Sequence, residues 1–135
     1  MILALDACTI IYLIEGGSPV ADLARARLQE LLRDPAARAV CSRLARLECR
    51  VGPLRVGDVA LLGRYDAFFQ RRRLRIVDVS AAAIERATEL RARYRFKTPD
   101  AIHLATAIEA QADLFLTGDA DLQRCTEAKV EVLQP

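Results

Sequence analysis

The chain has 135 residues, of which 53% are hydrophobic, and a formal net charge of +2 at pH 7. This composition excludes an intrinsically disordered protein, and the length is typical of one domain with a proper core. A charge so close to zero neither requires nor excludes a nucleic-acid partner. No apolar run reaches the roughly 18 residues of a membrane-spanning helix, so we expect no membrane contact.

The cysteines favour a reducing compartment. None of them forms a Cys-x-x-Cys pair, and the four are Cys8, Cys41, Cys49 and Cys125. The first residues also lack the basic segment of a signal peptide, so we expect free thiols and a cytoplasmic protein. No ligand spacing supports a zinc site that includes His103, and buried, apolar cysteines are the simpler interpretation.

The first half of the chain predicts two strands and three helices. Residues 2–5 form an unbroken apolar run that Asp6 closes, which is typical of a strand buried on both faces. Apolar spacing and caps then predict, in order, a helix at 9–15, a helix from 19 to about 33 after Ser18, a strand at 39–41 and a helix from Ser42 through Val51. Gly52 and Pro53 are expected to end or interrupt that helix.

The second half continues the alternation of helices and strands. It predicts a helix at 58–71, a strand at 74–79 and a helix at 81–94 after Ser80. A helix to about 110 is expected to begin with Thr98 as its cap and Pro99 in its first turn, and strands follow at 113–117 and 130–133. Helices between strands favour an α/β layer structure with a parallel sheet and right-handed crossovers. Since no linker divides the chain, we expect one domain over residues 1–135.

Four acidic residues are candidates for a shared site. Asp6 and Asp119 directly follow predicted strands, and Glu48 and Asp100 lie in the first two turns of predicted helices. In a parallel sheet these positions share one edge, so we expect the carboxylates to converge. Taken singly, Asp100 also suits a helix start, Asp119 a turn after Gly118, and Glu48 a solvated face. Asp6 closes a fully apolar strand and has no such explanation.

Convergence of these acids would favour a bound cation. Carboxylates a few Å apart raise each other's pKa values, and a hard divalent cation such as Mg²⁺ removes that penalty. Such a metal also activates water and neutralises charge on a phosphate, which are the two effects that phosphodiester hydrolysis needs. The sequence has no serine nucleophile elbow and no recognisable Cys–His pair, so its carboxylates are the main source of chemistry.

Four blocks of the sequence, in order, resemble PIN-domain proteins, in particular VapC-type toxins of bacterial toxin–antitoxin pairs. The blocks are the Leu5-Asp6 opening with its apolar run to Glu15, the Leu47-Glu48 helix, the segment from Pro99-Asp100 to Ala107, and the segment Leu116-Thr-Gly-Asp-Ala-Asp-Leu122. The departures are small and remove no carboxylate. Ala7 and Cys8 replace hydroxyl residues, Leu122 replaces a Phe, and Gly118 stands where a longer residue is common.

The resemblance implies a PIN-like three-layer fold, in which helices flank a central parallel sheet, and a metal-dependent endoribonuclease. It implies that Mg²⁺ or Mn²⁺ is bound among the acids, with Asp6, Asp100 and Asp119 as ligands and with Glu48 as the fourth catalytic residue. Water would attack the RNA to leave a 5′-phosphate and a 3′-hydroxyl. The resemblance further implies a cognate antitoxin that blocks the site and, often, a homodimer.

Three neighbours of the acids have two interpretations each. Asp121 is either a group that supports the acids or a turn residue, and Thr117 is either a hydrogen-bond partner of the site or an ordinary strand-end threonine. His103 shares a helix face with Asp100. It is more typical of a core residue than of a proton donor.

Basic residues and alternative functions complete the sequence-based hypotheses. Arg93, Arg95 and Lys97 lead into the acidic helix and are candidates for RNA contact, against a solvated helix face. The main alternative function is a catalytically silent PIN-like module that binds RNA or protein, which the retained acids disfavour. A receiver domain needs an acidic pair before its phospho-acceptor, and a haloacid-type phosphatase needs a second aspartate where Cys8 stands, so both are disfavoured.

Overall fold

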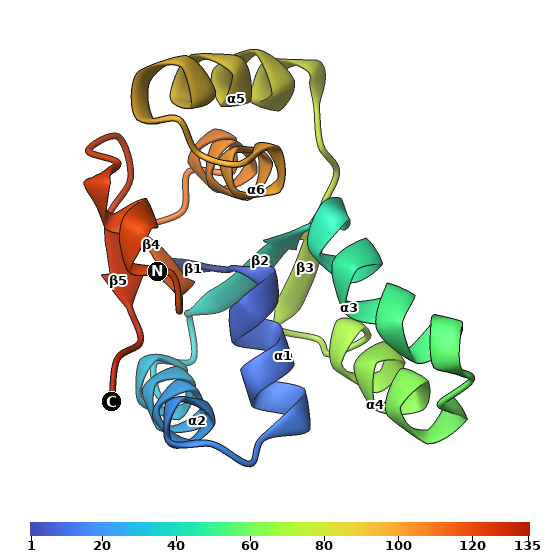
Figure 1. Ribbon diagram of the computed structural model, residues 1–135. Coiled ribbons are helices and arrows are strands. Elements are labelled where there is room, and N and C mark those ends of the chain that lie inside the picture. The colour runs from blue at the N-terminus through green and yellow to red at the C-terminus, as the bar shows by residue number, and fades with distance from the viewer.

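A five-stranded parallel sheet occupies the centre of the computed structural model, which describes residues 1–135 (Figure 1). Its strands are β1 (Ile2–Leu5), β2 (Arg38–Ser42), β3 (Leu74–Val77), β4 (Leu114–Thr117) and β5 (Val130–Val132). They lie in the order β3-β2-β1-β4-β5, so β1 is central, and every neighbouring pair is parallel. The predicted α/β fold with a central parallel sheet is thereby confirmed.

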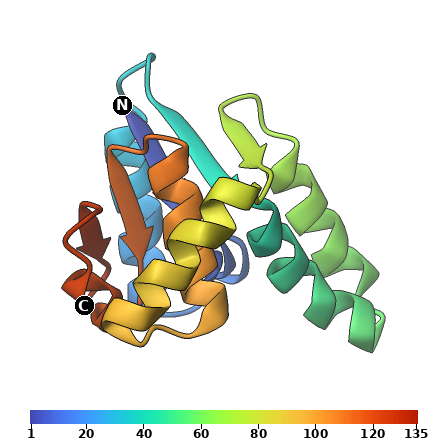
Figure 2. The ribbon, with the colours of Figure 1, turned by 90° about the horizontal axis from the view of Figure 1, so that it is seen from above.

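Helices cover both faces of this sheet and complete three layers. They are α1 (Ala7–Glu15), α2 (Pro19–Leu31), α3 (Arg43–Val56), α4 (Val59–Phe69), α5 (Ala81–Tyr94) and α6 (Thr98–Glu109), followed by the short 3₁₀ helix η1 (Ala120–Arg124). Figures 1 and 2 show α5 and α6 on one side, α1 and α2 on the other, and α3 and α4 as a pair that extends past the β3 edge. No helix is long and apolar enough to cross a membrane.

The core follows from the alternation of side chains along β1. Leu3 and Leu5 point to the face that α1 to α4 cover, where they join Ile10 and Tyr65, whereas Ala4 points to the face of α5 and α6. All five residues are almost fully buried. A strand that is apolar on both faces is what a parallel sheet between two helical layers requires, as the sequence predicted.

Local capping sets where three helices begin. The hydroxyls of Ser18, Ser42 and Ser80 each accept a hydrogen bond from the backbone N–H three residues later, over 3.2, 3.1 and 3.0 Å. These predicted caps are confirmed. At α6, however, Lys97 is the cap and makes no side-chain bond, so the predicted capping role of Thr98 is wrong.

The expectation that Gly52 and Pro53 end or interrupt the third helix is also wrong. Helix α3 continues through both residues to Val56 and ends where Gly57 adopts a left-handed conformation with φ of 71°. Pro53 lacks one N–H, but its ring is buried and its carbonyl accepts the N–H of Asp58 over 2.9 Å. Tertiary packing here outweighs the local helix-breaking tendency of proline.

Candidate functional site

Asp6 is the most buried acid at the carboxyl edge of the sheet. It follows β1, caps α1 and is 4% exposed. Its Oδ1 accepts the N–H of Ala7 over 2.9 Å, and its Oδ2 accepts the hydroxyl of Thr117 over 2.7 Å and the thiol of Cys8 over 3.5 Å. These donors supply the partners that a buried carboxylate needs, so Asp6 is held in a fixed orientation.

Thr117 joins Asp6 to the end of the neighbouring strand. Its hydroxyl, fully buried, also accepts the N–H of Asp119 over 3.1 Å. Oδ1 of Asp119 accepts the N–H of Asp121 over 3.0 Å, while the carboxylate of Asp121 turns away to pair with Arg124 at 2.7 Å. Thr117 is therefore a hydrogen-bond partner of the acids, and Asp121 supports Asp119 through its backbone.

The pKa of Asp100 is affected by the charges of the other three acids. It lies in the first turn of α6 and is half-buried. Burial, followed by the negative charges of Asp6 and Asp119, raises the pKa of Asp100 to about 6, with a smaller contribution from Glu48. Such coupling requires that the four carboxylates lie in one neighbourhood. The sheet and the helix starts thus bring together the four acids that the sequence indicated.

Glu48 lies on α3, near the other acids, and is hydrogen-bonded to a histidine. Nε2 of His103, on α6, makes a hydrogen bond to Oε1 of Glu48. Nδ1 of the same ring lies 2.7 Å from the hydroxyl of Ser42, at the end of β2. His103 is 4% exposed, so it is buried as the sequence suggested, yet it contacts a candidate catalytic acid.

Tyr12 is a neighbour of the site that the sequence did not single out. A Cβ atom added at Gly118 would lie 2.7 Å from both Cε2 and Oη of Tyr12, so the ring occupies the space of a side chain at position 118. Desolvation raises the pKa of the Tyr12 phenol, and so do the negative charges of Cys8, once its thiol is ionised at high pH, and of Asp6 and Asp119. Gly118, the glycine that departs from the family pattern, therefore leaves the space that the Tyr12 ring fills.

Cys8 takes the place of the hydroxyl residue expected after Asp6. Its thiol lies 3.6 Å from the Thr117 hydroxyl, and it accepts the N–H of Gly118 over 3.4 Å. Burial and the charge of Asp6 raise the pKa of Cys8 to about 11, so the thiol is neutral and can donate to Asp6. A hydrogen-bond donor to Asp6 is therefore present at this position although the hydroxyl is absent.

The donor set suits a hard divalent cation. The candidate ligands are carboxylate oxygens, which Mg²⁺ and Mn²⁺ prefer. In this arrangement no three His, Cys, Asp or Glu side chains form a group that can hold a metal ion together. Mg²⁺ is commonly bound by one or two carboxylates with water and substrate phosphates, so the residues present fit that mode.

The basic residues before α6 differ in whether their charge is already paired with an acid. Arg93 makes an ion pair with Glu127. Arg95 ends α5 in a left-handed conformation with φ of 60°, and both Arg95 and Lys97 are exposed and make no ion pair. They flank Phe96, which is buried and stacks on Tyr94 with ring centroids 5.0 Å apart. Two cations are thus displayed from a well-packed segment close to Asp100.

The chain is similar to one protein family and to several solved structures. A family model described as PIN domain matches residues 3–128. VapBC2 from Rickettsia felis, bound to a promoter DNA fragment, has a TM-score of 0.82 and 21% identity, over 99% of this chain and 100% of that one. A toxin–antitoxin complex from Klebsiella pneumoniae has a TM-score of 0.75 and 23% identity, over 98% of each chain.

A third solved structure is less similar but carries an activity in its description. VapC20 from Mycobacterium tuberculosis, a toxin that cleaves the sarcin–ricin loop, has a TM-score of 0.67 and 16% identity, over 84% of this chain and 86% of that one. No curated protein matches the chain significantly. At these identities the structures establish the common fold.

Proposed function

This chain belongs to the PIN-domain family, and we propose that it is a metal-dependent endoribonuclease and the toxin of a VapC-type toxin–antitoxin pair. The observation that carries the proposal is the half-buried Asp100, whose pKa is raised by burial and by the charges of Asp6, Asp119 and Glu48 at one edge of the sheet. The three solved structures support it, because two are toxin–antitoxin complexes and one is an RNA-cleaving toxin.

The proposed mechanism assigns separate tasks to the acids. Asp6, Asp100 and Asp119 would supply the carboxylates for Mg²⁺ or Mn²⁺, with one or two of them binding the ion directly and with water and RNA phosphates as its other ligands. Asp6 is fixed for this role by Thr117 and Ala7. When bound, the metal supplies an activated water and neutralises charge on the scissile phosphate. Glu48 has Oε1 bound to His103 and Oε2 without a hydrogen bond, so it can orient the attacking water. Arg95 and Lys97 hold neighbouring phosphates of the RNA.

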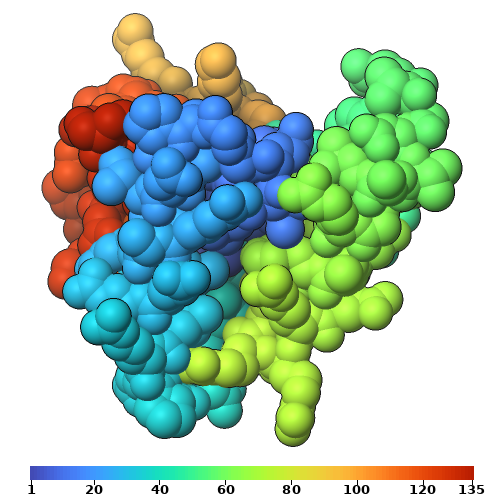
Figure 3. All heavy atoms as spheres, turned by 90° about the horizontal axis from the view of Figure 1, so that it is seen from below, coloured from blue at the N-terminus to red at the C-terminus, as the bar shows by residue number.

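A groove that faces away from α5 and α6 is the surface that we propose for the antitoxin. It has a volume of about 510 Å³ and is lined by α1, α2 and α4, and Figure 3 shows this face hollowed between α2 and α4. Leu13, Leu28 and Phe68 supply apolar contacts. Arg33 and Arg71 line it too and have no ion-pair partner. An apolar segment with acidic residues complements this lining.

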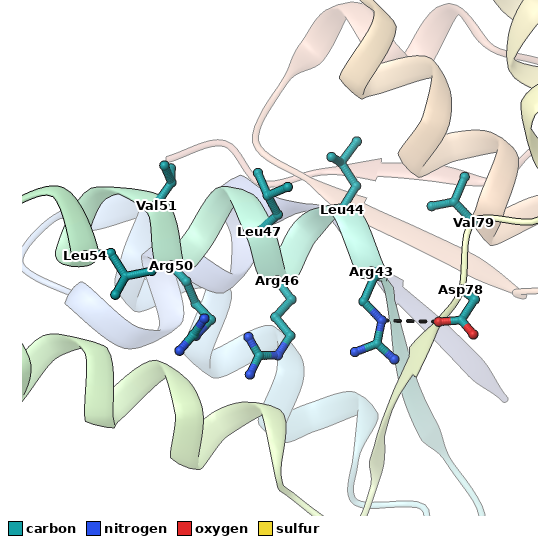
Figure 4. Close-up of a pocket in the computed structure, with 9 residues that line it drawn as sticks. All are labelled: Arg43, Leu44, Arg46, Leu47, Arg50, Val51, Leu54, Asp78 and Val79. Carbon is teal, nitrogen blue, oxygen red and sulfur yellow. Dashed lines mark hydrogen bonds and ion pairs between the residues drawn. The ribbon is translucent and has the colours of Figure 1, made fainter.

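A second groove, along α3, suits a second copy of the chain. Its volume is about 780 Å³, and Figure 4 shows Leu44, Leu47 and Val51 on one side of α3 and the arginines on the other. The three arginines are already paired, Arg43 with Asp78 and the other two, Arg46 and Arg50, with Asp66. The apolar side chains are therefore what the groove offers to a partner. Leu47, Val51 and Leu54 are 59%, 43% and 55% exposed and line the same groove, and a contiguous apolar patch of this kind is typical of an interaction surface. We propose a homodimer through this face, and Leu47→Lys should convert it to a monomer in light scattering.

Cleavage of an end-labelled, single-stranded RNA by the purified protein tests the proposed activity. We expect cutting with Mn²⁺ or Mg²⁺, none with EDTA, and none by Asp6→Asn, which keeps a good helix cap. Asp22→Asn, an exposed change on α2, is the matched control and should cut like wild type. Absence of cutting on several RNAs, together with no metal-induced rise in melting temperature, would refute the metal site and favour the silent binding module.

A further inference from the structure

A chain of hydrogen bonds joins three elements beside the acids. Ser42 ends β2, His103 lies in the second turn of α6, and Glu48 lies in the second turn of α3. Ser42 and His103 are each 4% exposed, whereas the side chain of Glu48 is 34% exposed. The buried imidazole therefore connects the sheet to an acid that solvent and substrate can reach.

For a neutral imidazole beside an ionised Glu48, the hydrogens in this chain have one consistent arrangement. An ionised carboxylate only accepts hydrogen bonds, so Nε2 of His103 must carry the hydrogen that points at Glu48. In the neutral ring Nδ1 then has a lone pair and accepts the hydroxyl hydrogen of Ser42, 2.7 Å away. The Ser42 oxygen is still free to accept the N–H of Ala45 over 3.1 Å, which is its capping bond. Every partner is satisfied.

This arrangement limits where the Glu48 carboxylate can lie. A glutamate has three rotatable side-chain bonds, and one on the partly exposed side of a helix is otherwise free to move into solvent. The ring that binds it is itself held by Ser42 and by burial in α6. Because Asp100 lies three residues before His103, helix α6 sets the position of one acid directly and of Glu48 through the ring.

We propose that His103 is a positioning residue, which holds Glu48 among the acids, and that Ser42 fixes the ring in the tautomer that does so. The proposal rests on the proposed nuclease function. Both ring nitrogens are already bonded and the residue is 4% exposed, so His103 has no route to the substrate. It acts on the reaction through Glu48, as hydrogen-bond partners of metal-site carboxylates do.

The first test is the tautomer of His103 in the metal-free wild-type protein. His103 is the only histidine in the chain, so long-range ¹H–¹⁵N NMR correlations of its ring are free of overlap. We expect a hydrogen on Nε2, and a change of the Nε2 signal in Glu48→Gln that Glu109→Gln, a control at the other end of α6, does not cause. A ring with an unprotonated Nε2, or one insensitive to Glu48→Gln, would overturn the proposal.

The second test separates positioning from a structural role. His103→Leu introduces an apolar side chain of similar bulk and removes the hydrogen-bond donor to Glu48, whereas His103→Gln restores an N–H donor. We expect His103→Leu to lower RNA cleavage by about 10- to 100-fold, and His103→Gln to recover most of it. Mn²⁺ affinity in calorimetry should stay near that of wild type in both variants, because Glu48 is not one of the three proposed ligands. In a Glu48→Ala background His103→Leu should add little, because the group it positions is gone.

The outcomes of the second test are distinct. Equal cleavage by His103→Leu and wild type, or an undiminished further loss in the Glu48→Ala background, would overturn the positioning role. A wild-type protein that neither binds Mn²⁺ nor cuts RNA would instead refute the proposed function. The NMR measurement on the wild-type protein still decides whether the ring holds Glu48, both in that case and in the separate case that His103→Leu does not fold.

Discussion

The hydroxyl of Thr117 donates a 2.7 Å hydrogen bond to Oδ2 of Asp6, across the boundary between β4 and β1. The same oxygen accepts the backbone N–H of Asp119, so one buried hydroxyl fixes the carboxylate of Asp6 relative to the backbone at Asp119. Their spacing is thereby set by the protein before any metal or substrate binds. Such preorganisation is what a site for a small cation requires.

Thr117→Val should weaken both the fold and the site. Valine has the same shape but leaves Oδ2 of Asp6 with one donor fewer and the N–H of Asp119 without its acceptor. We expect a loss of about 1–3 kcal/mol in the free energy of unfolding and a marked loss of cleavage. Thr117→Ser, which keeps the hydroxyl, should retain most of both. Urea denaturation and the RNA assay check this, and a Val variant equal to wild type would contradict it.

The stability of the metal-free protein should depend on pH through Asp100. Its pKa is raised from an ordinary value of 3.8 to about 6 by burial and by the charges of Asp6 and Asp119. The folded state therefore holds this proton more tightly than the unfolded state does. The resulting stabilisation is fully present below about pH 4 and is lost as pH rises through about 6.

Asp100→Asn isolates this contribution, since it removes the titrating group and keeps the shape. With EDTA present, the free energy of unfolding of the variant minus that of wild type should rise between pH 4 and pH 7. Mn²⁺ should also stabilise wild type more at pH 7 than at pH 5, because metal binding requires the ionised carboxylate. Urea denaturation across this range measures both, and a constant difference between the two proteins would show that Asp100 is not perturbed.

Gly118→Ala should disturb the site through Tyr12. The added methyl would lie 2.7 Å from the Tyr12 ring, so we expect a loss of about 1–3 kcal/mol and weaker cleavage as the ring moves. Gly63→Ala, in α4 with nothing within 4 Å, is the control and should gain about 0.5–1 kcal/mol. In a Tyr12→Ala background the cost at position 118 should shrink, and an equal cost in both backgrounds would exclude the clash.

The fold and the convergence of the acids could be predicted because both depend on short-range patterns. The apolar run before Asp6 indicates a buried parallel strand, and alternating strands and helices bring strand ends and helix starts to one edge. The continuation of α3 through Pro53 could not be predicted, because it depends on burial of that ring by distant residues.

The contacts that organise the site were less predictable for the same physical reason. These contacts join residues far apart in the sequence: His103 with Ser42 and Glu48, and Tyr12 with Gly118. Periodicity places each residue on a face of its own element but does not determine which side chain it meets. Gly118 was the one visible signal, since a glycine where a longer residue is common indicates that another group fills the space.

RNA binding should depend on Arg95 and Lys97 more than on Arg93, whose charge is already paired with Glu127. In an Asp6→Asn background, which prevents cleavage, replacing Arg95 and Lys97 together by Gln should weaken binding of a single-stranded RNA. It should also reduce the slope of log affinity against log salt by about 1.4, since each phosphate contact contributes about 0.7. Arg72→Gln, an exposed change before β3 at the opposite edge of the sheet, is the matched control. Filter binding at several salt concentrations measures these slopes, and equal slopes in the double variant and the control would place the RNA path elsewhere.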